Sequence, residues 1–148
     1  MRQLGLAVVA QATTIVPLIL LGTMDVGIRR DLGFDELSLG ALIAFCFAEA
    51  AVLSLVSGEI VDALGAGRGV ALAALAAAAG TGALAIVADG WPSTLLPLAL
   101  LGLGVAVVQP ATDVLIVEQV PVARHGIAFG LKQAAGGPAI GLLGGLAV

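Results

Sequence analysis

The stretch that decides the fold is LGLAVVAQATTIVPLILLGTM, residues 4–24, a run of 21 residues without a charge. A helix that rises 1.5 Å per residue needs about 20 apolar residues to cross roughly 30 Å of hydrocarbon. The stretch therefore predicts a membrane-spanning helix.

The rest of the chain has the same character. Of its 148 residues, 60% are hydrophobic and only 11% are charged, whereas a soluble domain has about 25% charged residues. The predicted spans cover about 4–24, 37–57, 70–88, 93–117 and 126–148, and Ser38 is the expected N-cap of the second.

These runs favour helices over barrel strands. Strands of a membrane barrel alternate between lipid-facing and lumen-facing residues in segments of about ten, but these runs are longer and apolar on all faces. The sequence predicts an all-α, polytopic membrane protein with five transmembrane helices.

Charge and cysteine content exclude several classes of function. The net charge is -4 and the six basic residues are scattered, so a nucleic-acid partner is not expected. Cys46 is the single cysteine, which excludes an internal disulfide. We find no phosphate loop, metal-ligand motif or nucleophile with a nearby base, so the sequence predicts no enzyme, cofactor or metal site.

Basic residues orient the predicted spans. An N-terminus on the cytoplasmic side places Arg2, Arg68 and Arg124 inside and leaves Arg29 and Arg30 outside. Because Lys and Arg are enriched in cytoplasmic loops, we expect a cytoplasmic N-terminus.

The segment GEIVDALGAGRG, residues 58–69, interrupts the apolar pattern between the second and third spans. Glycine permits a sharp turn, Asp62 offers a hydrogen-bond acceptor and Arg68 marks a cytoplasmic face. On spacing alone, a generic polar turn between membrane helices is the favoured interpretation of this composition.

The segment also resembles the loop between helices two and three of the major facilitator superfamily. That family carries the pattern Gly-x-x-x-Asp-Arg-x-Gly-x-Arg-Arg, and four of its positions match Gly58, Asp62, Gly65 and Arg68. Two basic positions are replaced by Ala63 and Gly67 in this sequence.

Further stretches extend the resemblance over the whole chain. LAVVAQATTIVPLILLG, IRRDLGFDELSLGALIA, LGLGVAVVQPATD and VPVARHGIAFGLKQAAGGPAIGLLGG look like helices one, two, four and five of bacterial members, in that order. The resemblance implies most of one six-helix half of such a transporter, placed in the inner cell membrane. It also implies a conformational role for Asp62 and Arg68, weakened by the missing arginines.

The fifth predicted span has one face of small residues. Gly126, Gly130, Ala134, Gly137, Gly141 and Gly144 recur at spacings of three and four. Such a face suits close packing against another helix. Lys132 lies about 200° around the helix from Gly130 and points to a polar cavity or to lipid.

Lys132 and Asp113 lie at similar depth from the cytoplasmic side, roughly 9 Å and 6 Å along their spans. Geometry permits an ion pair between them, with Gln109 one turn from Asp113 on the same helix face. The alternative is that Lys132 extends its ammonium to the interface and Asp113 is solvated at a helix end.

Glu49 is the deepest charge, about 18 Å into the second span from Leu37. Loss of water there favours the protonated form of a carboxyl group, which suits a proton-coupling site. A protonated glutamic acid hydrogen-bonded between helices, with no role in transport, is the alternative.

Together these features predict secondary transport of a small solute, coupled to an ion gradient. The expected partners are the lipid bilayer, the solute, a proton and the remaining helices of a transporter. The chain stops directly on an apolar helix at Val148, so we expect a fragment that is not competent alone. A small structural or interaction protein that self-associates and a dimeric mini-transporter are the alternatives.

Overall fold

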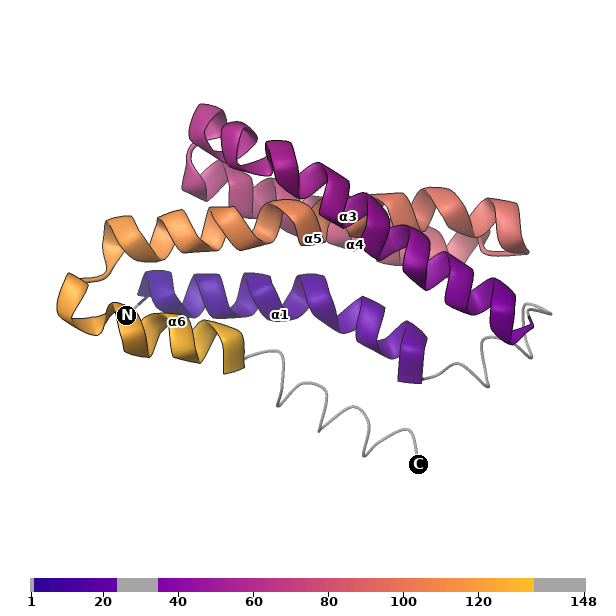
Figure 1. The fold of residues 1–148 in the computed structure, drawn as a ribbon, viewed down its shortest axis with the longest axis horizontal. Helices are drawn as coiled ribbons and strands as arrows, with labels where there is room; N and C mark the ends of the chain where they lie inside the picture. The colour runs from indigo at the N-terminus through magenta and orange to yellow at the C-terminus, as the bar shows by residue number, and fades with distance from the viewer. Residues whose placement is uncertain (1, 24–34, 135–148) are drawn as a thin grey trace.

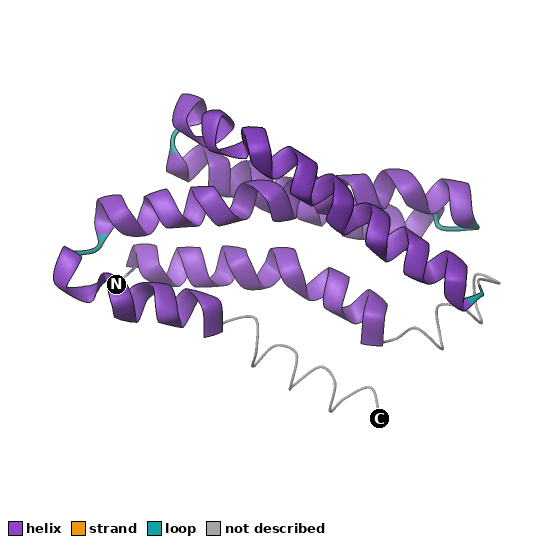
Figure 2. Ribbon diagram, in the orientation of Figure 1, coloured by secondary structure: helices purple, strands orange, loops and turns teal. Residues whose placement is uncertain are grey.

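The computed structural model describes residues 2–23 and 35–134. It contains α1 (Arg2–Thr23), α3 (Glu36–Leu64), α4 (Ala66–Val87), α5 (Trp91–Gln119), the 3-10 helix η1 (Val122–Arg124) and α6 (His125–Ala134) (Figure 1). No strand occurs in these two ranges (Figure 2), so the all-α prediction is confirmed.

Helices α1, α3, α4 and α5 are each long and apolar enough to cross a membrane. They lie side by side, and the chain reverses direction between α3 and α4, between α4 and α5, and again between α5 and α6 (Figure 1). The start of α1, the α3–α4 turn and the α5–α6 connection all lie at the left end of Figure 1. The part of the fifth predicted span after Ala134 lies outside the described residues.

The polar segment between the second and third spans is not a loop, contrary to the sequence prediction. Helix α3 continues to Leu64 and α4 begins at Ala66, so only Gly65 separates them. Gly65 has φ 84°, a conformation that glycine adopts without the steric cost of a Cβ, and its N–H donates to the Val61 carbonyl at 2.8 Å. The helices extend because Val61 and Ala66 are buried in the core.

The start of α3 also differs from the prediction. Asp35, rather than Ser38, is the N-cap, and its carboxylate accepts the Ser38 N–H at 2.8 Å. An aspartate at this position accepts a hydrogen bond from one of the free N–H groups of the first turn. Its negative charge also interacts favourably with the positive end of the helix dipole.

Helix α5 forms the centre of the bundle, because it contacts α1, α3, α4 and α6 and is the most deeply buried of the four long helices. Its buried residues join two apolar clusters. The first contains Ala7, Ala10, Val61, Ala66, Val70, Ala73, Val107, Val108, Ala111, Leu115, Ile116 and Ala128, and the second contains Leu18, Leu42, Cys46, Ala77, Leu98 and Leu101. Many of these residues are small, which lets helix backbones approach closely.

The backbones of α4 and α5 approach each other closely at Gly80. A Cβ added there would lie 2.7 Å from the Pro97 carbonyl oxygen and 3.0 Å from the Leu101 backbone nitrogen. Both are backbone atoms, so a side chain at position 80 would force the two helices apart.

We therefore expect Gly80→Ala to destabilise the bundle, although alanine favours a helix more than glycine by about 1 kcal/mol. Overpacking of this kind costs roughly 1–3 kcal/mol. Gly82→Ala is the matched control, because nothing lies within 4 Å of its added Cβ in the same helix. Thermal unfolding in detergent, followed by circular dichroism, should rank Gly82→Ala above wild type and Gly80→Ala below it. Equal melting of the two variants would contradict the close approach.

Candidate functional site

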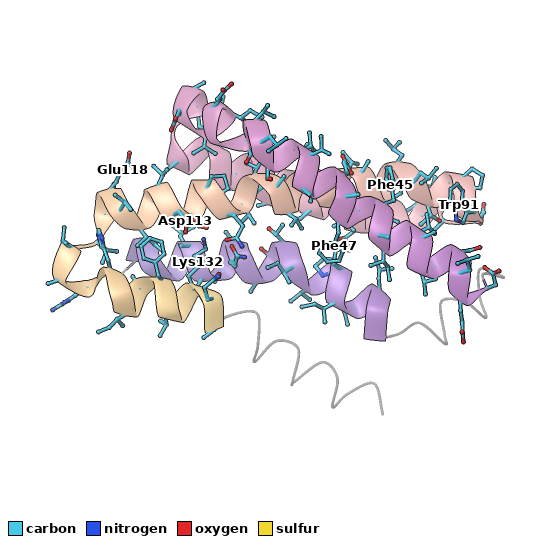
Figure 3. All side chains as sticks on the ribbon, in the orientation of Figure 1. Phe45, Phe47, Trp91, Asp113, Glu118 and Lys132 are labelled. Atoms are coloured by element: carbon cyan, nitrogen blue, oxygen red, sulfur yellow. The ribbon has the colours of Figure 1, made fainter. Side chains whose placement is uncertain are left out.

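An ion pair joins α6 to α5. Lys132 Nζ lies 2.5 Å from Asp113 Oδ1, and the two side chains point toward each other in Figure 3. The Lys132 side chain is 2% exposed and that of Asp113 is 47% exposed. The structure thus shows the interhelical pair rather than an ammonium extended to the interface.

Lys132 lies on the face of α6 that packs against the bundle. Ala128 and Lys132, four residues apart, are its buried residues. Gly126 and Gly130, on the small-residue face, are exposed, and an added Cβ at either would contact nothing within 4 Å. The predicted packing of that face is absent between the described helices, and the stripe beyond Ala134 lies outside them.

The backbone of α5 supplies a second acceptor to the ammonium. Lys132 Nζ donates to the Gln109 carbonyl oxygen at 3.3 Å, and the Thr112 hydroxyl donates to the same oxygen at 3.1 Å. Asp113 carries the stronger contact, because a hydrogen bond between two charged groups is the shorter and stronger kind.

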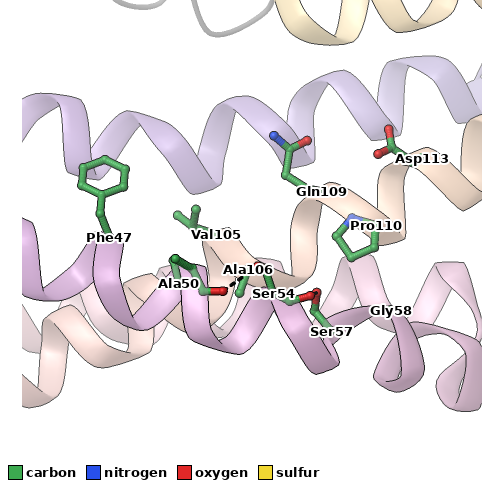
Figure 4. A pocket seen from close by; sticks show the side chains of 11 residues that line it. Phe47, Ala50, Ser54, Ser57, Gly58, Val105, Ala106, Gln109, Pro110 and Asp113 are labelled. Carbon is green, nitrogen blue, oxygen red and sulfur yellow. Dashed lines mark hydrogen bonds between the residues drawn. The ribbon is translucent and has the colours of Figure 1, made fainter.

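Asp113 also lines a groove between α3 and α5, with a cavity of about 480 Å³ (Figure 4). We call this the polar groove. Its lining consists of Phe47, Ala50, Ala51, Ser54, Ser57, Gly58, Val105, Ala106, Gln109, Pro110 and Asp113. Gln109, Asp113 and Lys132 are therefore brought together, two in the wall of the groove and one behind it.

An apolar groove of about 490 Å³ adjoins the polar groove and reaches α1. It is lined by Ile15, Leu18, Ile19, Gly22, Ile43, Phe47, Val105 and Gln109. Since Phe47, Val105 and Gln109 belong to both linings, the two grooves share a wall. Together they offer an apolar surface with a few polar groups, which is typical of small-molecule sites.

Glu49 lies apart from these residues. It is one residue from the middle of α3 but lines neither groove. Its Oε2 is buried, has no hydrogen-bond partner among the described residues, and would lie 2.6 Å from a Cβ added at Gly102 of α5. The carboxyl group therefore packs on a bare stretch of helix backbone where α3 meets α5.

The residues of the predicted conformational loop lie at the helix ends. Gly58 and Asp62 belong to α3, Gly65 forms the turn, and Arg68 belongs to the first turn of α4. Asp62 and Arg68 are both exposed, and neither makes an ion pair with another described residue.

Sequence reasoning missed several residues of the site. Phe47, Ser54 and Ser57 line the polar groove, and their spacings of seven and three residues indicate one helix face. That spacing does not reveal which helix the face meets. Gln11 of α1 was missed too, and its buried Oε1 has no hydrogen-bond partner in the described part of the chain.

The helices and the site define a polytopic membrane protein with a partly polar groove. The family model of the Major Facilitator Superfamily matches residues 4–148. The chain belongs to that family, whose members are transporters rather than enzymes. Comparison with curated proteins and with solved structures gives no match.

The unequal burial of the pair predicts unequal effects of its two substitutions. Asp113→Asn leaves a buried ammonium without its counter-ion, which costs on the order of 3–5 kcal/mol. Lys132→Met leaves a carboxylate that the groove already exposes, so the loss of stability should be smaller.

Unfolding of both single variants and of Asp113→Asn/Lys132→Met, in the same detergent, measures the coupling. We expect the double variant to be more stable than Asp113→Asn alone, because it no longer contains a buried unpaired charge. Additive effects of the two substitutions would contradict an interacting pair.

Proposed function

We propose that this chain supplies the solute-binding half of a secondary transporter that moves a small solute across the inner cell membrane. The observation that carries the proposal is the polar groove, which has the paired carboxylate of Asp113 in its wall and apolar helices around it. A charged group within a membrane span is costly, so it is usually paired or faces a water-filled path.

The helices that line the grooves support this proposal. Helices α1, α3 and α5 correspond by their order to helices one, two and four of the family, and α6 to helix five. The resemblance implies that these four helices form much of the cavity and gates in one half of the transporter.

A complete transporter of this kind needs a second half for alternating access, in which one bundle rocks against the other around the site. Five helices do not form two such halves. We therefore propose that this chain acts with further helices, and that by itself it is not competent for transport.

Arginine positions support a cytoplasmic N-terminus. Arg68 and Arg124 belong to the same end of the bundle as the start of α1, where Arg2 stands. Basic residues gather on the cytoplasmic side of membrane proteins.

The α3–α4 turn is the proposed conformational element. Asp62 and Arg68 would exchange partners there as the halves move. Alanine at position 63 and glycine at position 67 remove two basic groups from this turn, so we propose a weaker hold on one conformation than in the family pattern.

Flux into liposomes tests the proposal. We expect no solute or proton flux from the isolated chain, and flux once the missing helices are supplied as a second polypeptide or a fusion. A matched preparation with Asp113→Asn/Lys132→Met should bind the same helices but lose the flux. Flux from the isolated chain would favour a dimeric mini-transporter, and no flux with added helices would favour a structural protein.

Glu49 is the proposed proton-coupling residue, because its Oε2 is buried at the α3–α5 contact and has no hydrogen-bond partner in the part of the chain that the structure describes. Since it lies outside the grooves, it would act through the helix contact rather than by touching the solute. In the active form, Glu49→Gln should retain solute exchange but lose accumulation driven by a proton gradient. Glu59→Gln, an exposed position on the same helix, is the control. Proton-driven accumulation that persists in Glu49→Gln would exclude this role.

A further inference from the structure

The hydroxyl groups of the polar groove are hydrogen-bond acceptors. Ser54 Oγ donates its proton to the Ala51 carbonyl at 2.6 Å, and Ser57 Oγ donates to the Ser54 carbonyl at 3.0 Å. Because a hydroxyl group has one proton and two lone pairs, both side chains offer only lone pairs to a ligand in this arrangement.

The backbone of α5 contains a carbonyl without its usual helical donor beside the same groove. Pro110 has no N–H, so it cannot donate to the carbonyl of Ala106 four residues earlier. Ala106 and Pro110 both line the polar groove. Among the lining side chains, Gln109 is the only one with N–H groups to donate.

The ion pair presents its negative member to the groove. Asp113 lines the groove and is 47% exposed, whereas the Lys132 ammonium is enclosed behind it at 2% exposure. A ligand therefore meets the carboxylate and not the ammonium. A carboxylate has about four lone-pair sites and Lys132 uses Oδ1, so a second cation can bind the same group.

The remaining wall is apolar. Phe47 projects from α3 beside Val105 of α5 (Figure 4). The ring offers area for hydrophobic contact, and its face attracts cations.

We propose that the polar groove binds a small amphipathic organic cation, with its ammonium on Asp113 and its apolar part on Phe47 and Val105. The inference rests on the proposed function and specifies the class of solute. Anions are disfavoured because no described basic residue lines the groove and the Lys132 ammonium is enclosed behind Asp113. Neutral molecules lack the charge that strengthens a hydrogen bond to a carboxylate.

Three probes of equal size and different charge test this inference. Naphthylmethylamine, which is protonated at neutral pH, naphthylmethanol and naphthoate are titrated calorimetrically into the full chain in detergent micelles. We expect the ammonium probe to bind about tenfold or more tightly than the alcohol, since hydrogen bonds to charged groups are stronger than neutral ones. Naphthoate should bind least.

Variants locate the binding. Asp113→Asn should remove the preference for the ammonium, but it also leaves Lys132 unpaired. Ala51→Phe fills the groove without altering the ion pair and should abolish the selective binding. Val52→Phe is its control, because Val52 is the next residue, is exposed and does not line the groove.

Four outcomes would overturn the inference. The three probes could bind equally, naphthoate could bind most tightly, or no probe could bind. The fourth is that Ala51→Phe and Val52→Phe have the same affinities for the probes. Binding is measured without transport, so these results are independent of flux. Flux of a solute of another class would leave the proposed function standing while this inference fails.

Discussion

The central constraint on this structure is that a lysine ammonium inside an apolar bundle needs a counter-charge. Lys132 finds it in Asp113 at 2.5 Å, with the Gln109 carbonyl as a second acceptor. This requirement fixes which face of α6 packs on the bundle, and it places the aspartate where α3 and α5 border a groove. Removal of either charged group therefore affects both the packing of α6 and the polarity of the groove.

The bundle that supports this pair depends on small residues rather than on large apolar ones. Gly80 of α4 lies against the backbone of α5. Gly104 of α5 lies against α4, because a Cβ added at Gly104 would be 3.0 Å from the Ala73 carbonyl oxygen. Close backbone contact of this kind holds membrane helices together, because lipid gives no hydrophobic drive for them to associate. Helix α5 can then contact four neighbours and present Gln109 and Asp113 on the remaining side.

Helix content, the membrane class and the family could be predicted from sequence, because length and apolar character decide them almost alone. The pairing of Lys132 with Asp113 was one of two open alternatives, since depth along a span can be counted but the rotation of neighbouring helices cannot. The helix ends at the α3–α4 turn were also predicted wrongly, because the sequence does not show which side of a helix is buried. Charged residues such as Asp62 suggest a loop, but they are equally compatible with the exposed side of a helix whose other side is buried through Val61. Likewise, the small-residue face of α6 is suited to close packing, but the sequence pattern does not predict which helix packs against it.

The chain contains one lysine, which makes the central ion pair directly measurable. Lysine labelled with heavy nitrogen at Nζ gives one side-chain ammonium signal by nuclear magnetic resonance in detergent. The structure predicts that hydrogen exchange at this ammonium is much slower than for a solvent-exposed lysine, and that Asp113→Asn accelerates it or abolishes the signal. Rapid exchange in the wild-type chain, unchanged in Asp113→Asn, would contradict the buried pair on which this account depends.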